Sequence, residues 1–291
     1  MSSYSRIAAV TGGNKGVGLA CVRQLALKYP QSSLNNGPFL IYLTARNQER
    51  GEKALNDILQ DLQLKEAKAL QKDGGLSDVK YLPLDIDSQD SIKSFAATLK
   101  KEHPEGIDIL LNNAGVALDG FDASVVKKTL HCNYYGTMEA VNQILPQIKD
   151  GGRIVNVASI AGTLDSKYAA PIRQRFLDAQ KTDEITALME EFTTAVEKNQ
   201  YEGTWPGAAY KVSKAGVIGM TKTLAMDNAR TGSKTLINSC CPGYVNTDMT
   251  KGRGAKTPDE GAQTPVLLAL GDIEGSNANF WYNGKITPWE R

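Results

Sequence analysis

The sequence predicts a doubly wound α/β protein, in which helices cover both faces of a parallel sheet. Apolar runs of strand length alternate with amphipathic helical patterns along nearly the whole chain. The runs are rich in Val, Ile and Leu without polar alternation, which is typical of strands buried on both faces. A glycine-rich segment follows the first run directly. The predicted strands are residues 6–11, 39–44, 79–84, 107–111, 153–158 and 236–240.

The composition bounds the kind of protein and its surroundings. The 291 residues could form one large or two small domains, but no linker interrupts the alternation, so we expect a single domain over residues 1–291. A formal net charge of +1 lacks the basic surplus of a nucleic-acid-binding protein. The first apolar run is too short for a signal peptide or a membrane span.

The cysteines point to a reducing compartment. They lack metal-ligand spacing, and they are too few for a disulfide framework in a chain of this length. We therefore expect a cytoplasmic protein without a bound metal. The four residues are Cys21, Cys132, Cys240 and Cys241.

One connection is far longer than the others. About fifty residues separate the fifth predicted strand from the helix that opens near Ala209, where such connections usually need ~2–6. Thr182 begins a capped helical pattern within this stretch, so we expect a helical insertion over about residues 160–208. Its apolar face contains Ile185, Leu188, Met189, Phe192 and Val196.

The glycine-rich segment is the first candidate site. Its sequence is Thr11-Gly-Gly-Asn-Lys-Gly-Val-Gly18, and a helical pattern follows directly. Such a strand-to-helix turn brings backbone N–H groups and the positive end of a helix dipole close to a pyrophosphate. The alternative is a tight turn that only closes a βα unit. The predicted dinucleotide-binding residues here are Gly12, Asn14, Lys15, Gly16, Val17 and Gly18.

The end of the second strand predicts which dinucleotide is bound. An acidic residue at this place selects the 2′-hydroxyl of NAD, whereas a cation accommodates the 2′-phosphate of NADP. The strand ends Thr44-Ala-Arg46 without a carboxylate, and Lys15 lies in the glycine turn. Arg46 and Lys15 together favour NADPH/NADP, unless both are ordinary solvated cations.

A tyrosine and a lysine are candidates for acid–base chemistry. Tyr210 and Lys214 stand four positions apart on a predicted helix, so they project from one face. A phenol titrates near ~10, and a neighbouring ammonium should lower that pKa. Tyr210 would then act as a general acid, with Lys214 as its partner.

Two further polar residues have both a functional and a structural explanation. Ser159 follows the fifth strand, at the edge where α/β sheets bind ligands, but a serine there is often only a cap or turn residue. Asn133 stands mid-helix in a stretch beginning near Phe121, where its polarity needs a reason. It could serve the site, or it could line the core with its amide bonded to backbone.

In combination these segments resemble the short-chain dehydrogenase/reductase family, whose members share this Rossmann fold. Within the family the chain is similar to carbonyl reductases of the monomeric type with a long insertion. The likeness covers nearly the whole chain, in the family's order. The matching segments are the glycine turn, Leu84-Asp-Ile86, Asn112-Asn-Ala-Gly115, Asn133, Ser159, Tyr210 with Lys214, and Cys241-Pro-Gly-Tyr-Val-Asn-Thr247.

The resemblance implies a catalytic role for four residues, Asn133, Ser159, Tyr210 and Lys214. Ser159 and Tyr210 would polarise a carbonyl group while NADPH gives a hydride to its carbon, and Tyr210 would supply the proton. Lys214 would bind the nicotinamide ribose and connect to solvent through a water near Asn133. The further cofactor-binding residues that it implies are Asp85, Ile86, Asn112, Ala114, Gly115, Pro242, Gly243, Val245 and Thr247.

Several alternatives stay open at this level. The same residues would serve an NADP-linked alcohol or hydroxysteroid dehydrogenase working in the oxidative direction, and a non-catalytic dinucleotide sensor could share the fold. We expect a small-molecule carbonyl substrate and neither a nucleic-acid nor a membrane partner. The resemblance also implies a monomer, and it places Cys241 near the nicotinamide, either as a reactive thiol or as an inert buried one.

Overall fold

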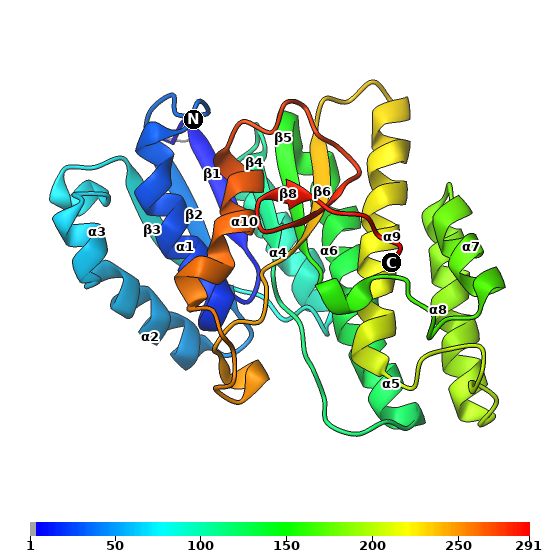
Figure 1. The fold of residues 1–291 in the computed structure, drawn as a ribbon. Coiled ribbons are helices and arrows are strands. Elements are labelled where there is room, and N and C mark those ends of the chain that lie inside the picture. The colour runs from blue at the N-terminus through cyan, green and yellow to red at the C-terminus, as the bar shows by residue number, and fades with distance from the viewer. Residues whose placement is uncertain (1–3) are drawn as a thin grey trace.

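A computed structural model describes residues 4–291 of the protein. Its strands form one sheet in the order β3-β2-β1-β4-β5-β6-β7-β8 (Figure 1), in which β1 to β7 run parallel and β8 pairs antiparallel with β7. The strands are β1 Arg6–Val10, β2 Phe39–Ala45, β3 Ser77–Pro83, β4 Ile107–Asn112, β5 Ile148–Val157, β6 Leu236–Cys241, β7 Phe280–Tyr282 and β8 Lys285–Ile286.

Helices cover both faces of this sheet, which confirms the predicted fold class. One face packs against α1 Gly16–Lys28, α2 Gln48–Leu59, α3 Leu62–Glu66 and α10 Pro258–Leu270. The other face packs against α4 Gln89–Glu102, α6 Thr137–Ile144 and α9 Ala209–Arg230. Every residue of the central strands β2 and β4 is buried, as expected for a sheet covered on both faces.

All six strands predicted from the sequence are present, with small differences at their ends. β5 starts at Ile148, five residues before the predicted Arg153, because Ile148 already pairs with Ile107 ahead of a register shift. The stretch between them includes Gly151, with a φ of 75°, and Gly152, so it carries no apolar strand pattern. The short strands β7 and β8, of three and two residues, were not predicted. They form the edge of the sheet beside β6.

The insertion contains two helices, α7 Ala170–Asp178 and α8 Thr182–Glu197, which lie at the outer flank beside α9 (Figure 1). Helix α8 begins at Thr182 as predicted, and the five residues of its apolar face are at most 8% exposed. It approaches α9 at two glycines, where added Cβ atoms would meet Met189 Sδ and Ile185 Cδ1, each at 2.7 Å. The glycines are Gly216 and Gly219.

The predicted helix around Asn133 is not a regular α-helix. It starts as α5 Ala123–Leu130, widens into a π-helix at His131–Gly136, and continues as α6. A π-helical turn inserts an extra residue into the helix, and such turns occur frequently at functional sites. Asn133 lies inside this turn, with a fully buried side chain.

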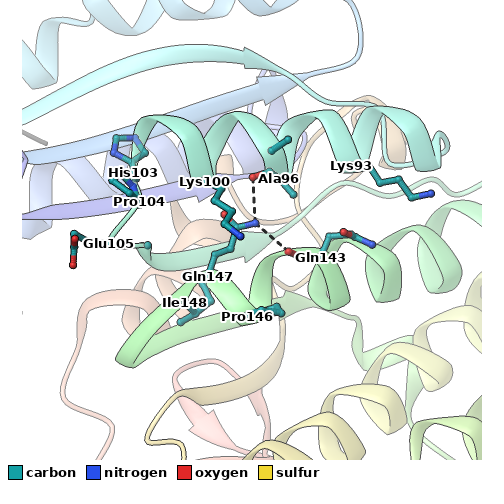
Figure 2. A pocket seen from close by; sticks show the side chains of 12 residues that line it. Lys93, Ala96, Lys100, His103, Pro104, Glu105, Gln143, Pro146, Gln147 and Ile148 are labelled. Atoms are coloured by element: carbon teal, nitrogen blue, oxygen red, sulfur yellow. Dashed lines mark hydrogen bonds between the residues drawn. The ribbon is translucent and has the colours of Figure 1, made fainter. Parts of the chain in front are cut away.

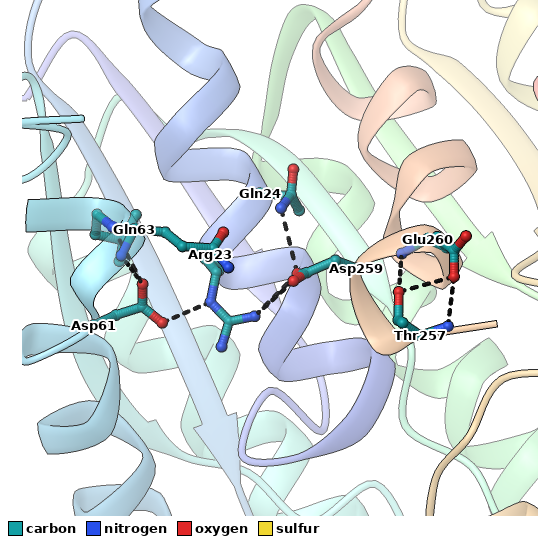
Figure 3. Close-up of polar contacts among 8 residues, drawn as sticks. Arg23, Gln24, Asp61, Gln63, Thr257, Asp259 and Glu260 are labelled. Atoms are coloured by element: carbon teal, nitrogen blue, oxygen red, sulfur yellow. Dashed lines mark hydrogen bonds and ion pairs between the residues drawn. The ribbon is translucent and has the colours of Figure 1, made fainter. Parts of the chain in front are cut away.

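An ion network joins the helices on one face of the sheet (Figure 3). Arg23 of α1 binds Asp61, the N-cap of α3, through Nε at 2.7 Å. Its Nη1 binds Asp259, in the first turn of α10, at 2.9 Å, and Gln24 donates to the same carboxylate. Side chains of Arg23 and Asp61 are at most 20% exposed, so the network fixes α10 against α1.

No helix within residues 4–291 combines the length and the apolar character that crossing a membrane requires.

Candidate active site

The strand order places a topological switch point between the carboxyl ends of β1 and β4. Chain connections lead away from these two strands in opposite directions across the sheet, and doubly wound proteins bind ligands at such a switch point. The sequence-predicted residues all follow strand ends at this edge or stand on helices α9 and η3, the π-helical turn His131–Gly136. The connections involved are those after β1, β2, β3, β4, β5 and β6.

The glycine turn after β1 is closely packed. An added Cβ at Gly18 would lie 2.2 Å from the carbonyl oxygen of Gly12, so any larger residue would push the turn apart. Thr11 Oγ1 accepts hydrogen bonds from the backbone N–H groups of Asn113 and Ala114, each at 3.0 Å. The turn is therefore tied to the segment that follows β4.

The start of α1 fits a pyrophosphate. The first turn of the helix has no acidic residue, and the N-cap residue Lys15 makes no side-chain cap. The N–H groups at the start of the helix thus remain available to an anion, with the positive end of the dipole behind them. This arrangement agrees with the dinucleotide site expected at Gly12 to Gly18.

The two cations predicted for a 2′-phosphate are both accessible. Lys15 is 63% exposed, and its Nζ lies 2.7 Å from Oδ2 of Asp248. Arg46 is 67% exposed, and its Nη1 lies 3.9 Å from Oδ2 of Asp87. Exposed ion pairs of this kind are weak, so both cations can exchange partners.

Helix α9 presents Tyr210 and Lys214 to the end of β5. Lys214 Nζ donates to the carbonyl oxygen of Val157 at 2.9 Å and lies 5.7 Å from the centre of the Tyr210 ring. The Lys214 side chain is 4% exposed, and this burial lowers its pKa from 10.5 to about 8. It nevertheless carries a positive charge at neutral pH.

The predicted lowering of the Tyr210 pKa is wrong for the protein alone. Burial raises the pKa of Tyr210 to about 12 and outweighs the opposing hydrogen bond with Ser159. Ser159 also caps the short 3-10 helix η5 Ile160–Gly162, since its Oγ accepts from the N–H of Ala161 at 3.1 Å. Ser159 thus fills the cap position and reaches Tyr210 as well.

Asn133 holds the π-helical turn against its neighbours. Its Oδ1 accepts from the N–H of Val116 at 2.8 Å, and its Nδ2 donates to the carbonyl of Val116 at 2.9 Å. Nδ2 also donates to Ser213 Oγ, which in turn donates to the carbonyl oxygen of Tyr210. The amide is therefore bonded to backbone, and through Ser213 it is connected to α9.

Gly115, in the segment after β4, lies close to both Asn133 and Lys214. An added Cβ there would lie 3.0 Å from Asn133 Oδ1 and 3.5 Å from Lys214 Nζ. The structure thus brings Asn133, Ser159, Tyr210 and Lys214 into one region beside the segment after β4.

The residues predicted to lie on the adenine side of the cofactor stand at the ends of β3 and β4. Ile86 is 8% exposed, and the backbone N–H of Asp85 donates to Ser91 Oγ. The side chain of Asn112 is buried and donates to Asn156 Oδ1 at 2.9 Å, so it stabilises the sheet and leaves its backbone at the strand end.

The segment after β6 lies against the glycine turn. Val245 is buried against Gly261 of α10, close to Val17 of α1. Pro242 and Gly243 connect this residue to the strand, and the Gly243 N–H points to Cys241 Sγ at 3.2 Å. Cys241 itself is 2% exposed, which favours the inert alternative for its thiol.

A cavity of about 440 Å³ lies at the opposite edge of the sheet (Figure 2). It is bordered by the end of α4 and the start of β5, with His103, Gln147 and Ile148 among its lining residues. Because ligands of doubly wound sheets bind at the carboxyl ends of strands, this cavity is not the candidate active site.

Four residues that organise the site were not predicted from the sequence: Thr11, Asn113, Ser213 and Asp248. Thr11 directly precedes the first glycine and Asn113 the predicted Ala114, so both could have been found by their place in the motifs. Asp248 pairs with a residue 233 positions away, and no sequence pattern indicates that contact.

The fold and the site define an α/β protein of the dinucleotide-binding class. A family model for the short chain dehydrogenases matches residues 6–171 and 198–258. The chain belongs to this family. It is 38% identical to human carbonyl reductase [NADPH] 1, over 99% of this chain and 100% of that protein.

Two further relatives agree with this membership. Rat carbonyl reductase [NADPH] 3 is 38% identical, over 93% of this chain and 92% of that protein. The solved structure of salutaridine reductase from Papaver somniferum superimposes with a TM-score of 0.78 at 27% identity. That alignment covers 96% of this chain and 99% of the other. The family match is interrupted between residues 171 and 198, a stretch that includes most of α7 and all of α8.

Proposed function

We propose that the protein is an NADPH-dependent carbonyl reductase that converts ketones, aldehydes or quinones to alcohols. The observation that carries the proposal is the meeting of Tyr210, Ser159 and Lys214 at the end of β5, beside a glycine turn suited to a pyrophosphate. The human and rat relatives, which are named carbonyl reductases [NADPH], support both the reaction and the cofactor.

When bound, NADPH would supply the hydride that the carbonyl carbon accepts. The Tyr210 hydroxyl, protonated well beyond neutral pH, donates its proton to the carbonyl oxygen, and the Ser159 hydroxyl orients that oxygen. The buried ammonium of Lys214 stabilises the tyrosinate that this transfer leaves behind. Asn133 positions the π-helical turn against α9 through its hydrogen bond to Ser213.

We assign the remaining cofactor-binding residues from the strand ends and the helix start at which they lie. Lys15 and Arg46 bind the 2′-phosphate, and the start of α1 binds the pyrophosphate. Asp85 and Ile86 flank the adenine, with the backbone of Asn112 and Gly115 at the ribose. On the nicotinamide side we assign Val245 and Thr247.

Removal of the Tyr210 hydroxyl tests the reaction. Tyr210→Phe should lose more than about 90% of quinone- or aldehyde-dependent NADPH oxidation, while the Kd for NADPH stays within about two-fold. Tyr29→Phe is the matched control, because the Tyr29 hydroxyl donates to the carbonyl of Gly37 in the loop that leads to the amino end of β2, whereas Tyr210 lies at the carboxyl ends of the strands. Retention of more than about a tenth of the activity in Tyr210→Phe would contradict the acid assignment.

We also propose that the chain is one domain and a cytoplasmic monomer. The apolar face of α8 is buried on α5 and α9, and the family resemblance identifies that surface as the one through which related subunits pair. Light scattering at micromolar concentration should give about 31.5 kDa. A particle of twice this mass would show that the covered surface does not prevent pairing.

A further inference from the structure

The turn after β6 is a compact structure. Residues Asp248–Thr250 form the 3-10 helix η6, which ends at Lys251 in a left-handed conformation with a φ of 52°. Thr250 Oγ1 donates to the carbonyl of Val245 at 2.7 Å and accepts from the N–H of Thr247 at 3.1 Å. These internal bonds fix the direction in which Asp248 leaves the turn.

This turn is seated on the glycine turn at two adjacent residues. A Cβ added to Gly16 would come within 3.2 Å of the Thr247 methyl group, so the two backbones are close. The next residue, Asp248, accepts a hydrogen bond from Lys15 Nζ at 2.7 Å. The Asp248 carboxylate, from the C-terminal half of the chain, is thus paired with Lys15, the cation next to the start of α1.

The surrounding charges favour this carboxylate. The hydrogen bond and the charge of Lys15 lower the pKa of Asp248, and the charge of Arg50 lowers it further. The first turn of α1 supplies no acidic residue of its own. Asp248 is therefore held by the same kind of positive environment that a phosphate would seek.

We propose that Asp248 is a specificity-determining residue for the cofactor: its carboxylate competes with the 2′-phosphate of NADPH for Lys15 and leaves NADH unaffected. This inference rests on the proposed function, in which Lys15 binds that phosphate. A phosphate monoester carries more negative charge than one carboxylate at neutral pH, so it displaces Asp248. NADPH can bind only after the exposed Lys15–Asp248 ion pair breaks, so Asp248 weakens NADPH binding by the free energy of that pair. NADH has no 2′-phosphate and binds with the pair intact.

The expected effect is modest and selective. Asp248 is 79% and Lys15 63% exposed, so the pair should weaken NADPH binding about two- to five-fold at low ionic strength. Asp248→Asn should lower the Kd for NADPH by that factor and leave the Kd for NADH unchanged, as measured by fluorescence titration. The matched control is Asp119→Asn, another exposed carboxylate, which pairs with Lys251 at 2.8 Å and should change neither Kd.

A double-mutant cycle distinguishes competition from simple charge removal. In the Lys15→Met background, Asp248→Asn should no longer improve NADPH binding. The carboxyl pKa of Asp248, followed by NMR in the protein labelled at aspartate, should rise when NADPH takes Lys15 away. An equal gain for NADH, or a full gain in the Lys15→Met background, would overturn the competition. If Lys15→Met leaves the Kd for NADPH unchanged, the proposed phosphate site is refuted together with the inference.

Discussion

Because Lys214 is buried, the free energy of unfolding of the cofactor-free protein should be larger at mildly alkaline pH than at neutral pH. Among residues 4–291 no carboxylate forms an ion pair with Lys214, and the Val157 carbonyl accepts its hydrogen bond. Burial lowers the pKa of this lysine from 10.5 to about 8. The unfolded chain therefore binds a proton that the folded chain has lost, and stability must rise with pH between these two values.

The size of the effect follows from the two pKa values. Their difference corresponds to roughly 3 kcal/mol over the whole window, and roughly 2 kcal/mol falls between pH 7.5 and 9.5. Tyrosines of the unfolded chain ionise near ~10, so measurements should stay below that pH. Lys214→Met removes this titration and adds a constant penalty for the unpaired Val157 carbonyl.

Urea unfolding of both proteins without cofactor provides the assay. The difference in the free energy of unfolding between wild type and Lys214→Met should change by roughly 2 kcal/mol from pH 7.5 to 9.5, in favour of the wild type at the higher pH. Lys211→Met is a control, because Lys211 lies on the same helix but forms an ion pair with Asp165. A difference that stays constant to within about 0.5 kcal/mol would refute the depressed pKa.

Three further predictions concern packing, the ion network and the thiols. Phe192→Ala should destabilise the fold by about 3–5 kcal/mol in urea unfolding, since the ring is fully buried beside Trp205; a loss below about 1 kcal/mol would mean that α8 is not docked. Arg23→Met should cost about 2 kcal/mol by leaving two carboxylates without their partner, and an unchanged midpoint would contradict the network. Cys241 should resist a maleimide in the folded protein, with or without NADPH, and rapid labelling detected by mass spectrometry would contradict its burial.

The sheet and the inserted helix could be predicted because their signals are local. Buried parallel strands need continuous apolar runs, and the six strands that carry such runs were all found. The apolar face of α8 repeats at helical spacing, so the sequence predicted both its start at Thr182 and its buried side. Helix α7 lacks this clarity, because only Ile172 and Phe176 of its nine residues are buried.

Features that depend on distant partners could not be predicted. Strand β7 has three residues and is stabilised by pairing with β6, so its sequence alone carries too little pattern. The π-helical turn at Asn133 is held by bonds to Val116 and Ser213 that become apparent only in three dimensions. Periodicity instead predicts an ordinary helix there.

The Tyr210–Lys214 pair shows why a correct motif can still mislead about chemistry. Spacing of four residues correctly places both side chains on one face of α9. The sequence does not reveal that both groups are removed from water, and desolvation raises the tyrosine pKa while it lowers the lysine pKa. Burial therefore determines the direction of the Tyr210 pKa shift in the protein alone, and the hydrogen bond with Ser159 opposes it only in part. Burial keeps Tyr210 protonated as a proton donor, and the ammonium beside it has the greatest effect when the proton leaves.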